Sequence, residues 1–220
     1  MIEHRSHVRR HRGDTWKREC SMQDVARVLD YWFGNEPDDG RLADQRAPLW
    51  WSKNADTDAE IRDRFEPLVL AAERGELADW EATPEGRLAL IILTDQFPRN
   101  IYRDTPDAFR FDGLARQHCL EGIRLGQDRG LRPVQRVFWY MPLEHSEVLE
   151  HQDQSVALFR ELAEEVDAAL ASTFEYFLDF AIRHRDIIQR FGRFPHRNTI
   201  VGRASTEEEQ AFLQQPGSSF

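Results

Sequence analysis

The sequence predicts an all-α protein made of antiparallel helix pairs. Along most of the chain, apolar residues recur at the 3.6-residue spacing of an α-helix, and the pairs Thr83-Pro84 and Thr105-Pro106 are typical helix starts. No segment shows sustained alternation of apolar and polar residues, which argues against a sheet. Because short connections join helices as antiparallel neighbours, we expect either a stacked array or a compact bundle.

The first predicted helix begins at Ser21, an N-cap residue with Asp24 three positions further on. It carries an apolar face at helical spacing, formed by Val25, Val28, Leu29, Trp32 and Phe33. Gly34 is expected to end this helix, and residues 35–47 are predicted to be a loop.

Two further helices are expected in the first half of the chain. Thr57 and Glu60 have the spacing of a capping box, and this helix should end at Gly75 with a kink at Pro67. The next helix starts at Thr83-Pro84, where proline occupies the first helical position, and should run to Asp95 before Pro98 ends it.

The second half repeats the same signals. Predicted helices cover residues 105–126, Val134 to Tyr140 with a break at Pro142, Ser146 to Ala163, Ala171 to Phe191, and a short terminal segment capped at Ser205-Thr206. We expect residues 21–220 to form a single domain. Residues 1–20 are basic and lack apolar periodicity, so they are expected to be a mobile extension.

Composition limits the class of protein. The 220 residues carry a formal net charge of −10, so the chain as a whole is not expected to coat nucleic acid or an anionic membrane. The longest apolar run, residues 88–93, is far too short to span a bilayer. With Cys20 and Cys119 as the two cysteines, a disulfide framework is not expected and a cytoplasmic location is favoured.

Positive charge gathers near the C-terminus. Residues 183–203 contain six arginines but a single acidic residue, Asp186. Contact with RNA through Arg183–Arg203, with Phe191 and Phe194 as stacking groups, is therefore one possible function. The acidic remainder of the chain makes it the least favoured one.

A short motif that occurs twice in the chain is the strongest candidate for a site. Gln96-Phe97-Pro98-Arg99-Asn100 and Arg193-Phe194-Pro195-His196-Arg197-Asn198 each follow an apolar helix. In both, proline is expected to end the helix, so that Arg and Asn project from a rigid corner. The alternative for Asn100 and Asn198 is that they satisfy carbonyl groups at a helix end.

Two polar residues interrupt apolar helix faces. Asp95 continues the face of Leu88, Ile91 and Ile92, and His184 lies on a face with Phe177 and Ile188. Half-buried polar groups need partners. A structural interpretation pairs Asp95 with His184 or Arg190, and a functional one makes Asp95 and His184 part of a site.

Glu144-His145-Ser146-Glu147 follows the expected break at Pro142. These residues could simply begin a helix, with Ser146 or Glu147 at its start. Alternatively, His145 and Glu147 are an acid/base pair. The spacing matches no standard metal motif, and no nucleotide, nucleophile-elbow or redox motif is present, so neither a metal nor a cofactor is expected.

These segments together resemble an uncharacterised bacterial family, domain of unknown function 924. The resemblance covers about residues 22–212 and is most specific in the run from His184 to Asn198, supported by Tyr31 to Gly34 and His145-Ser146-Glu147. It implies a tetratricopeptide-like right-handed array of helix pairs, and it brings no established activity. Val148 departs from the acidic residue expected after His-Ser-Glu.

The function favoured by the sequence is a pocket for a small anionic metabolite, with acid/base chemistry as an option. Proton-transfer candidates are His145, Glu147, His184 and Asp95. Ligand-binding candidates are Arg99, Asn100, Arg190, Arg193, His196, Arg197 and Asn198. The main alternative is a scaffold that binds an acidic peptide on the same arginines. The oligomeric state is not predicted.

Overall fold

The computed structural model describes residues 22–218, and the regular elements in this part of the chain are all helices, with no strand. The all-α prediction is therefore confirmed. The expected N-cap at Ser21 and the basic extension lie outside the described residues. Within the described residues, no helix is both long and apolar enough to cross a membrane.

A first helix covers residues 22–33, and the others follow with short connections. The α-helices are α2 (Asp39–Trp51), α3 (Ala55–Glu73), α4 (Pro84–Ile91), α5 (Phe97–Ile101), α6 (Asp112–Arg124), α7 (Pro133–Glu144), α8 (Leu149–Glu165), α9 (Ala171–Phe191) and α10 (Glu207–Leu213). Short 3-10 turns (Ala78–Ala82, Pro106–Phe109, Asp128–Gly130 and Pro195–Arg197) and a π turn (Ile92–Gln96) complete the described elements.

Two central helices organise the core. Every residue of α4 from Gly86 onward and nearly all of α7 are buried, as expected for helices surrounded by others on all sides. Large side chains from the other helices, including Trp32, Phe65 and Phe97, pack around them. The polar residues that end these two central helices are therefore buried as well.

The helix α2 was predicted to be a loop, and that prediction was wrong. Asp38 acts as N-cap, with its carboxylate accepting a hydrogen bond from the Arg41 backbone, and Leu42, Ala43 and Trp50 supply a buried face. Residues 35–47 contain few apolar residues, so the periodicity was too weak to reveal it. The helix α3 likewise starts earlier than predicted, because Asn54 caps it.

Neither of the two prolines that were expected to end or break a helix, Pro98 and Pro142, does so. At Pro98 the preceding turn is a π turn, in which the Phe97 N–H donates to the Ile92 carbonyl, and α5 continues through the proline. Pro98 occupies the first turn of α5, where its missing N–H is not required. Pro142 lies inside α7, which continues to Glu144.

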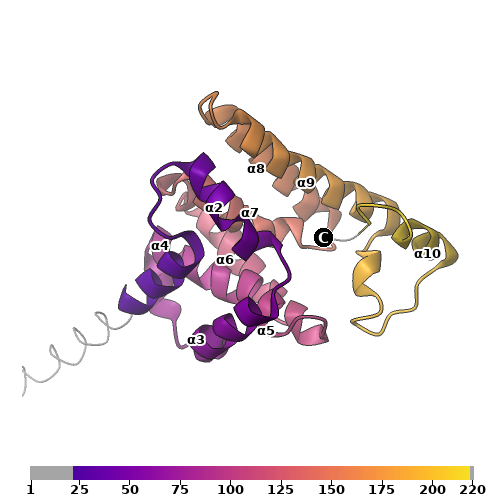
Figure 1. Ribbon diagram of the computed structural model, residues 1–220, viewed down its shortest axis with the longest axis horizontal. Coiled ribbons are helices and arrows are strands. Elements are labelled where there is room, and N and C mark those ends of the chain that lie inside the picture. Colours follow the sequence, from indigo (N-terminus) through magenta and orange to yellow (C-terminus); the bar gives the residue numbers. More distant parts are fainter. Residues whose placement is uncertain (1–21, 219–220) are drawn as a thin grey trace, which may run out of the picture.

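The last part of the chain forms a hairpin and a small C-terminal unit. Figure 1 shows α8 and α9 side by side along one edge, with α10 at one end. The predicted bounds of α9 are confirmed, and so is the capping box formed by Thr206 and Glu209. Gly192, in the left-handed region at φ 69°, ends α9, and a small second cluster of Ile187, Ile188 and Phe194 packs there.

Candidate functional site

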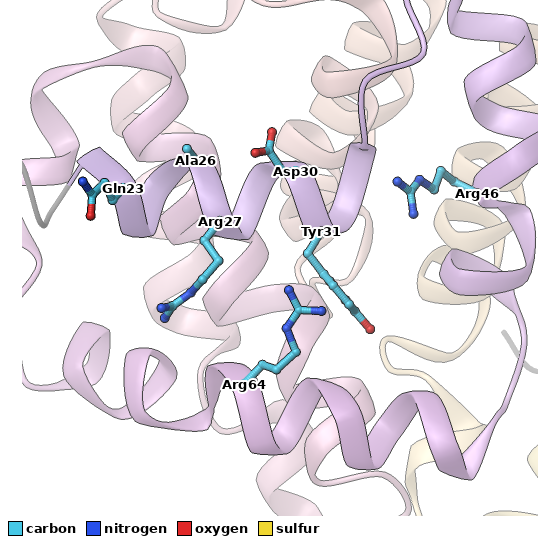
Figure 2. Close-up of a pocket in the computed structure, with 7 residues that line it drawn as sticks. All are labelled: Gln23, Ala26, Arg27, Asp30, Tyr31, Arg46 and Arg64. Carbon is cyan, nitrogen blue, oxygen red and sulfur yellow. The ribbon is translucent and has the colours of Figure 1, made fainter.

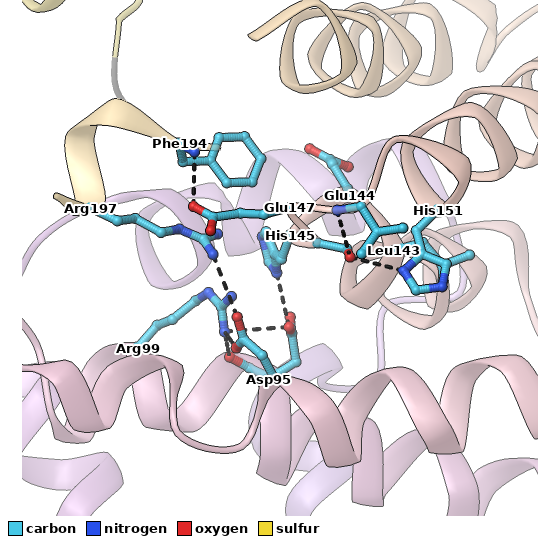
Figure 3. Close-up of polar contacts among 12 residues, drawn as sticks. Asp95, Arg99, Leu143, Glu144, His145, Glu147, His151, Phe194 and Arg197 are labelled. Atoms are coloured by element: carbon cyan, nitrogen blue, oxygen red, sulfur yellow. Dashed lines mark hydrogen bonds and ion pairs between the residues drawn. The ribbon is translucent and has the colours of Figure 1, made fainter. Parts of the chain in front are cut away.

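Asp95 lies on the π turn that joins α4 to α5, and it is completely buried. Its carboxylate accepts a hydrogen bond from Gln96 Nε2 at 2.6 Å, and its Oδ1 lies 2.9 Å from His145 Nδ1 and 3.3 Å from Arg99 Nη1 (Figure 3). Burial opposes ionisation of this carboxyl, but Arg99 and His145 outweigh burial and hold its pKa well below its usual range. Asp95 is therefore an anion, and π turns of this kind often occur at functional sites.

His145 directly follows α7 and is buried with Asp95. Burial, followed by the charge of Arg99, lowers the pKa of His145, so the imidazole is neutral at pH 7. Because Asp95 is ionised, the proton of the neutral ring resides on Nδ1 and is donated to Asp95. The lone pair of Nε2 is then the proton-accepting position of this side chain.

Arg99 and Arg197 come from the two copies of the repeated motif and meet at one carboxylate. Arg99 Nη1 lies 3.1 Å from Asp112 Oδ1, and Arg197 Nη1 lies 3.6 Å from Asp112 Oδ2. Both guanidinium groups also lie over the ring of Phe109, at 5.8 Å and 4.7 Å from its centroid. Figure 3 shows the two arginines extending toward each other from different elements. Burial and the neighbouring Arg99 lower the pKa of Arg197 to about 10.

Glu147 connects the loop before α8 with the C-terminal unit. Its carboxylate accepts two hydrogen bonds from Arg203, at 2.6 Å and 2.8 Å, and one from the Phe194 backbone N–H at 2.8 Å. Burial raises the pKa of this carboxyl, but the bonds from Arg203 and Phe194 outweigh that effect, and its pKa is lowered. Glu147 is thus an ionised group that fixes Arg203, and it does not contact the imidazole of His145.

His184 has a different carboxylate partner from the one predicted. Its Nδ1 lies 2.9 Å from Glu144 Oε1, and both side chains are buried. Because Asp95 pairs with His145 and Arg99, the predicted pairing of Asp95 with His184 or Arg190 is wrong. The rings of His145 and His184 are 6.2 Å apart, so two carboxylate–imidazole pairs lie side by side.

A cavity of about 290 Å³ opens beside this cluster. Its walls carry three guanidinium groups, two carboxylates, one imidazole and an apolar part, formed by Phe109, Asp112, Arg116, His145, Ser146, Glu147, Val148, Arg197, Val201 and Arg203. Asp112 and Glu147 engage Arg197 and Arg203. Among the described residues, Arg116 has no carboxylate within ion-pair distance.

The other predicted ligand-binding residues do not line this cavity. Arg190 lies on the surface of α9, 2.8 Å from Glu208, and Arg193 is held by Glu209 at 2.6 Å. These two arginines stabilise α10 against α9. The ring of His196 packs against that of Phe194, and burial and the charge of Arg197 lower the pKa of His196 to about 3.

The two predicted asparagines connect segments of the fold through side-chain hydrogen bonds. Asn100 donates a hydrogen bond to Asp58 at 2.8 Å, and Asn198 donates to Ser205 at 3.1 Å. Neither is explained by capping a carbonyl at the helix end, since both side chains bond to side chains of other segments. Of the predicted site residues, the structure thus brings together Asp95, Arg99, His145, Glu147 and Arg197.

Sequence reasoning missed Phe109, Asp112, Arg116 and Arg203 as site residues. Asp112 occupies the first turn of α6, where an acidic residue is favoured on every helix, so its sequence position carries no special signal. Arg116 lies one turn later, and the pair at (i, i+4) suggests an ordinary surface ion pair. The contact between Arg197 and Asp112, which the tertiary structure creates, is what marks α6 as part of the site.

A second hollow has a different set of lining residues from the cavity beside His145. It is open, with about 610 Å³, and is lined by Gln23, Ala26, Arg27, Asp30, Tyr31, Arg46 and Arg64 (Figure 2). Its arginines have partners: Arg27 pairs with Asp24 and Arg64 with Glu60. Nothing in it combines a buried acid with a base. In residues 22–218, no group of three or more His, Cys, Asp or Glu could hold a metal ion.

Comparison with known protein families matches the chain to one of them. The model for "Bacterial protein of unknown function (DUF924)" covers residues 28–217. The chain belongs to the DUF924 family. No curated protein matches the chain.

A solved structure supports the fold of this DUF924 chain. The protein of unknown function ATU0120 from Agrobacterium tumefaciens is 36% identical, with a TM-score of 0.75, and the match covers 88% of this chain and 98% of that one. That protein is likewise one of unknown function.

Proposed function

We propose that the cavity beside Asp95 and His145 binds a small anionic metabolite, and that His145 accepts a proton from it or from water. The observation that carries the proposal is the incomplete neutralisation of its cationic wall. Arg197 is nine-tenths buried yet lies 3.6 Å from the nearest carboxylate, and Arg116 has no ion-pair partner among the described residues.

The buried Arg197 and the half-buried Arg116 both favour an anion. A guanidinium group removed from water loses solvation, and a charge-assisted hydrogen bond to a carboxylate or phosphate recovers much of it. The lowered pKa of Arg197 reflects the same unfavourable burial. An anion between Arg116 and Arg197 would neutralise both groups without displacing Asp112.

The proton-transfer part of the proposal rests on the Asp95–His145 pair. Asp95 fixes the ring with the proton on Nδ1, which leaves Nε2 as a base on a residue that lines the cavity. When Nε2 accepts a proton, the ionised Asp95 stabilises the imidazolium that forms. Because the pKa of His145 is lowered, the ring is already in its proton-accepting form at pH 7.

Binding is tested by isothermal titration calorimetry with acetate and inorganic phosphate. Replacing Arg116 or Arg197 with Gln should weaken binding by about tenfold or more, since a hydrogen bond to a charged group contributes roughly 1.5–3 kcal/mol. Arg190→Gln is the matched control, because Arg190 pairs with Glu208 outside the cavity. Equal affinity in all three variants, or no binding by the native protein, would refute the proposal.

The role of His145 has a separate spectroscopic test. Nitrogen chemical shifts from NMR should show the neutral tautomer with the proton on Nδ1 and a titration midpoint below the usual value of about 6.5. Bound anion opposes the field of Arg99 and should move that midpoint upward. If the titration midpoint of His145 is the same with and without the anion, His145 is not part of the binding site.

The acidic-peptide alternative has less support. Of the three tryptophans that could form an exposed docking surface, Trp50 and Trp139 are buried and Trp51 alone is exposed. A tetratricopeptide-like stacking of helix pairs and a cytoplasmic location stay predictions. The small cavity with buried polar groups favours a small ligand over a peptide.

The RNA alternative is weaker still. Each arginine between residues 183 and 203 has an acidic neighbour, namely Asp179, Asp153, Glu208, Glu209, Asp112 and Glu147 in chain order. Phe194, expected to stack on a base, is fully buried. Binding to a single-stranded oligonucleotide that weakens steeply with salt would restore this alternative.

A further inference from the structure

Two exposed valines line the cavity. Val148 and Val201 line it and are 43% and 37% exposed, and Leu149, next in the chain to Val148, is 36% exposed. The other exposed large apolar side chains of the described residues lie on other elements: Met22, Trp51, Leu125 and Tyr176. Isolated exposed apolar residues need no explanation, but two that line the same cavity are consistent with a binding surface.

These valines are held in place from two directions. Val148 is the N-cap residue of α8, and Val201 lies in the turn after the 3-10 helix, where its N–H donates to the Arg197 carbonyl. The ion pair between Glu147 and Arg203 joins the residues beside them. Because Glu147 precedes Val148 and Arg203 follows Val201 by two positions, this one ion pair fixes both valines at the same rim.

The charge of the wall selects among anions. Three guanidinium groups, from Arg116, Arg197 and Arg203, face two carboxylates, from Asp112 and Glu147, while His145 is neutral. The lining therefore has one positive charge in excess. This matches a single carboxylate better than the two charges of a phosphate monoester.

We propose that the ligand is an aliphatic carboxylate, with its head between Arg116 and Arg197 and its chain against Phe109, Val148 and Val201. This inference rests on the proposed function and adds the substrate class. A cavity of about 290 Å³ holds on the order of ten non-hydrogen atoms, at about 30 Å³ for each water-sized group. A carboxylate with up to about eight carbons fits that volume.

The test is a chain-length series of acetate, butanoate, hexanoate and octanoate, titrated into the full chain by calorimetry. Each methylene that leaves water for an apolar wall should improve affinity by about threefold to fourfold. The gain should stop once the chain fills the cavity. A series with one Kd for acetate and hexanoate would overturn the inference.

Matched variants separate the head group from the chain. Val148→Thr and Val201→Thr keep the side-chain shape at exposed positions but add a hydroxyl group, so together they should flatten the chain-length series. Leu125→Gln, an exposed residue outside the cavity, is the control and should leave the series intact. A series that stays steep in the double valine variant would place the chain elsewhere and overturn the inference.

The outcomes also distinguish this inference from the proposed function. If all four acids bind equally and Arg197→Gln abolishes binding of each, the anion site stands and the aliphatic preference fails. If none of the acids binds and phosphate does, the anion site again stands without this substrate class. If neither the acids nor phosphate bind, both proposals fail.

Discussion

The segments Gln96–Asn100 and Arg193–Asn198 share Phe, Pro, Arg and Asn but take different backbones. The first stays helical, because a π turn admits Pro98 into α5. The second leaves the helix at Gly192 and forms a 3-10 turn that includes the additional residue His196. Both nevertheless deliver an arginine to Asp112.

The difference lies in what each arginine does there. Arg99 forms ion pairs with both Asp95 and Asp112, so it holds the buried cluster together. Arg197 has the longer contact with Asp112 and lines the cavity. Similar sequences thus supply one cation held between two carboxylates and one cation that lines the cavity, and the surrounding carboxylates decide which is which.

The largest effect is expected at the first segment's anchor. Asp95→Ala leaves His145 buried without its carboxylate and Arg99 with Asp112 alone, and should lower the free energy of unfolding by about 3–5 kcal/mol. Urea unfolding measures this change. A loss below about 1 kcal/mol would mean that Asp95 does not hold the cluster.

Replacing the residue shared by both segments should separate stability from binding. Asp112→Asn removes the carboxylate that both arginines approach, which should cost about 2 kcal/mol in urea unfolding. The same variant should bind acetate more tightly, because a competing anion next to Arg197 has gone. Weaker acetate binding would contradict the assignment of Arg197 to the ligand.

Gly192 tests the backbone of the second segment. Its φ of 69° disfavours any side chain, although an added Cβ would meet nothing within 4 Å. Gly192→Ala should therefore lower the free energy of unfolding by about 1–2 kcal/mol through strain alone. Gly113→Ala, a helical position with open space around it, is the control and should not destabilise the protein. An unchanged midpoint for Gly192→Ala would show that this turn relaxes freely.

A smaller effect is expected when the second segment's cation is removed. Since Arg197 is buried and weakly paired, Arg197→Met should change the free energy of unfolding by no more than about 1 kcal/mol, in either direction. The matched variant at the first segment, Arg99→Met, should destabilise the protein more. Equal losses at the two positions would remove the distinction between them.

The inserted His196 should be silent at pH 7. Its folded pKa of about 3 lies below the usual value of about 6.5, so the unfolded chain takes up the proton first. Stability from this residue is fully present above pH 6.5 and is lost as pH falls toward 3. His196→Asn should flatten this part of the pH dependence, measured by urea unfolding between pH 7 and pH 4. A variant with the native slope would assign the loss to other groups.

Local sequence signals determined the helices wherever caps and apolar periodicity agree. The bounds of α9 and the Thr206 capping box follow from side chains within a few positions of one another, and such signals need no tertiary partner. Residues 39–47 were predicted to be a loop, and Pro98 and Pro142 were expected to end or break a helix, but the structure places all of them in helices. Their helical state depends on burial and on the preceding turn, which no local pattern encodes.

The chain by itself also supplied the candidate residues Asp95, His145, Arg99 and Arg197, together with Glu147 and His184. Tertiary structure alone decided the pairing, because His145 comes 50 residues after Asp95, and Asp112 joins two arginines nearly 100 positions apart. An ion pair depends on distance in space, and sequence fixes distance only along a helix. Packing of the C-terminal unit against the end of the two central helices therefore creates the cavity that the sequence could only suggest.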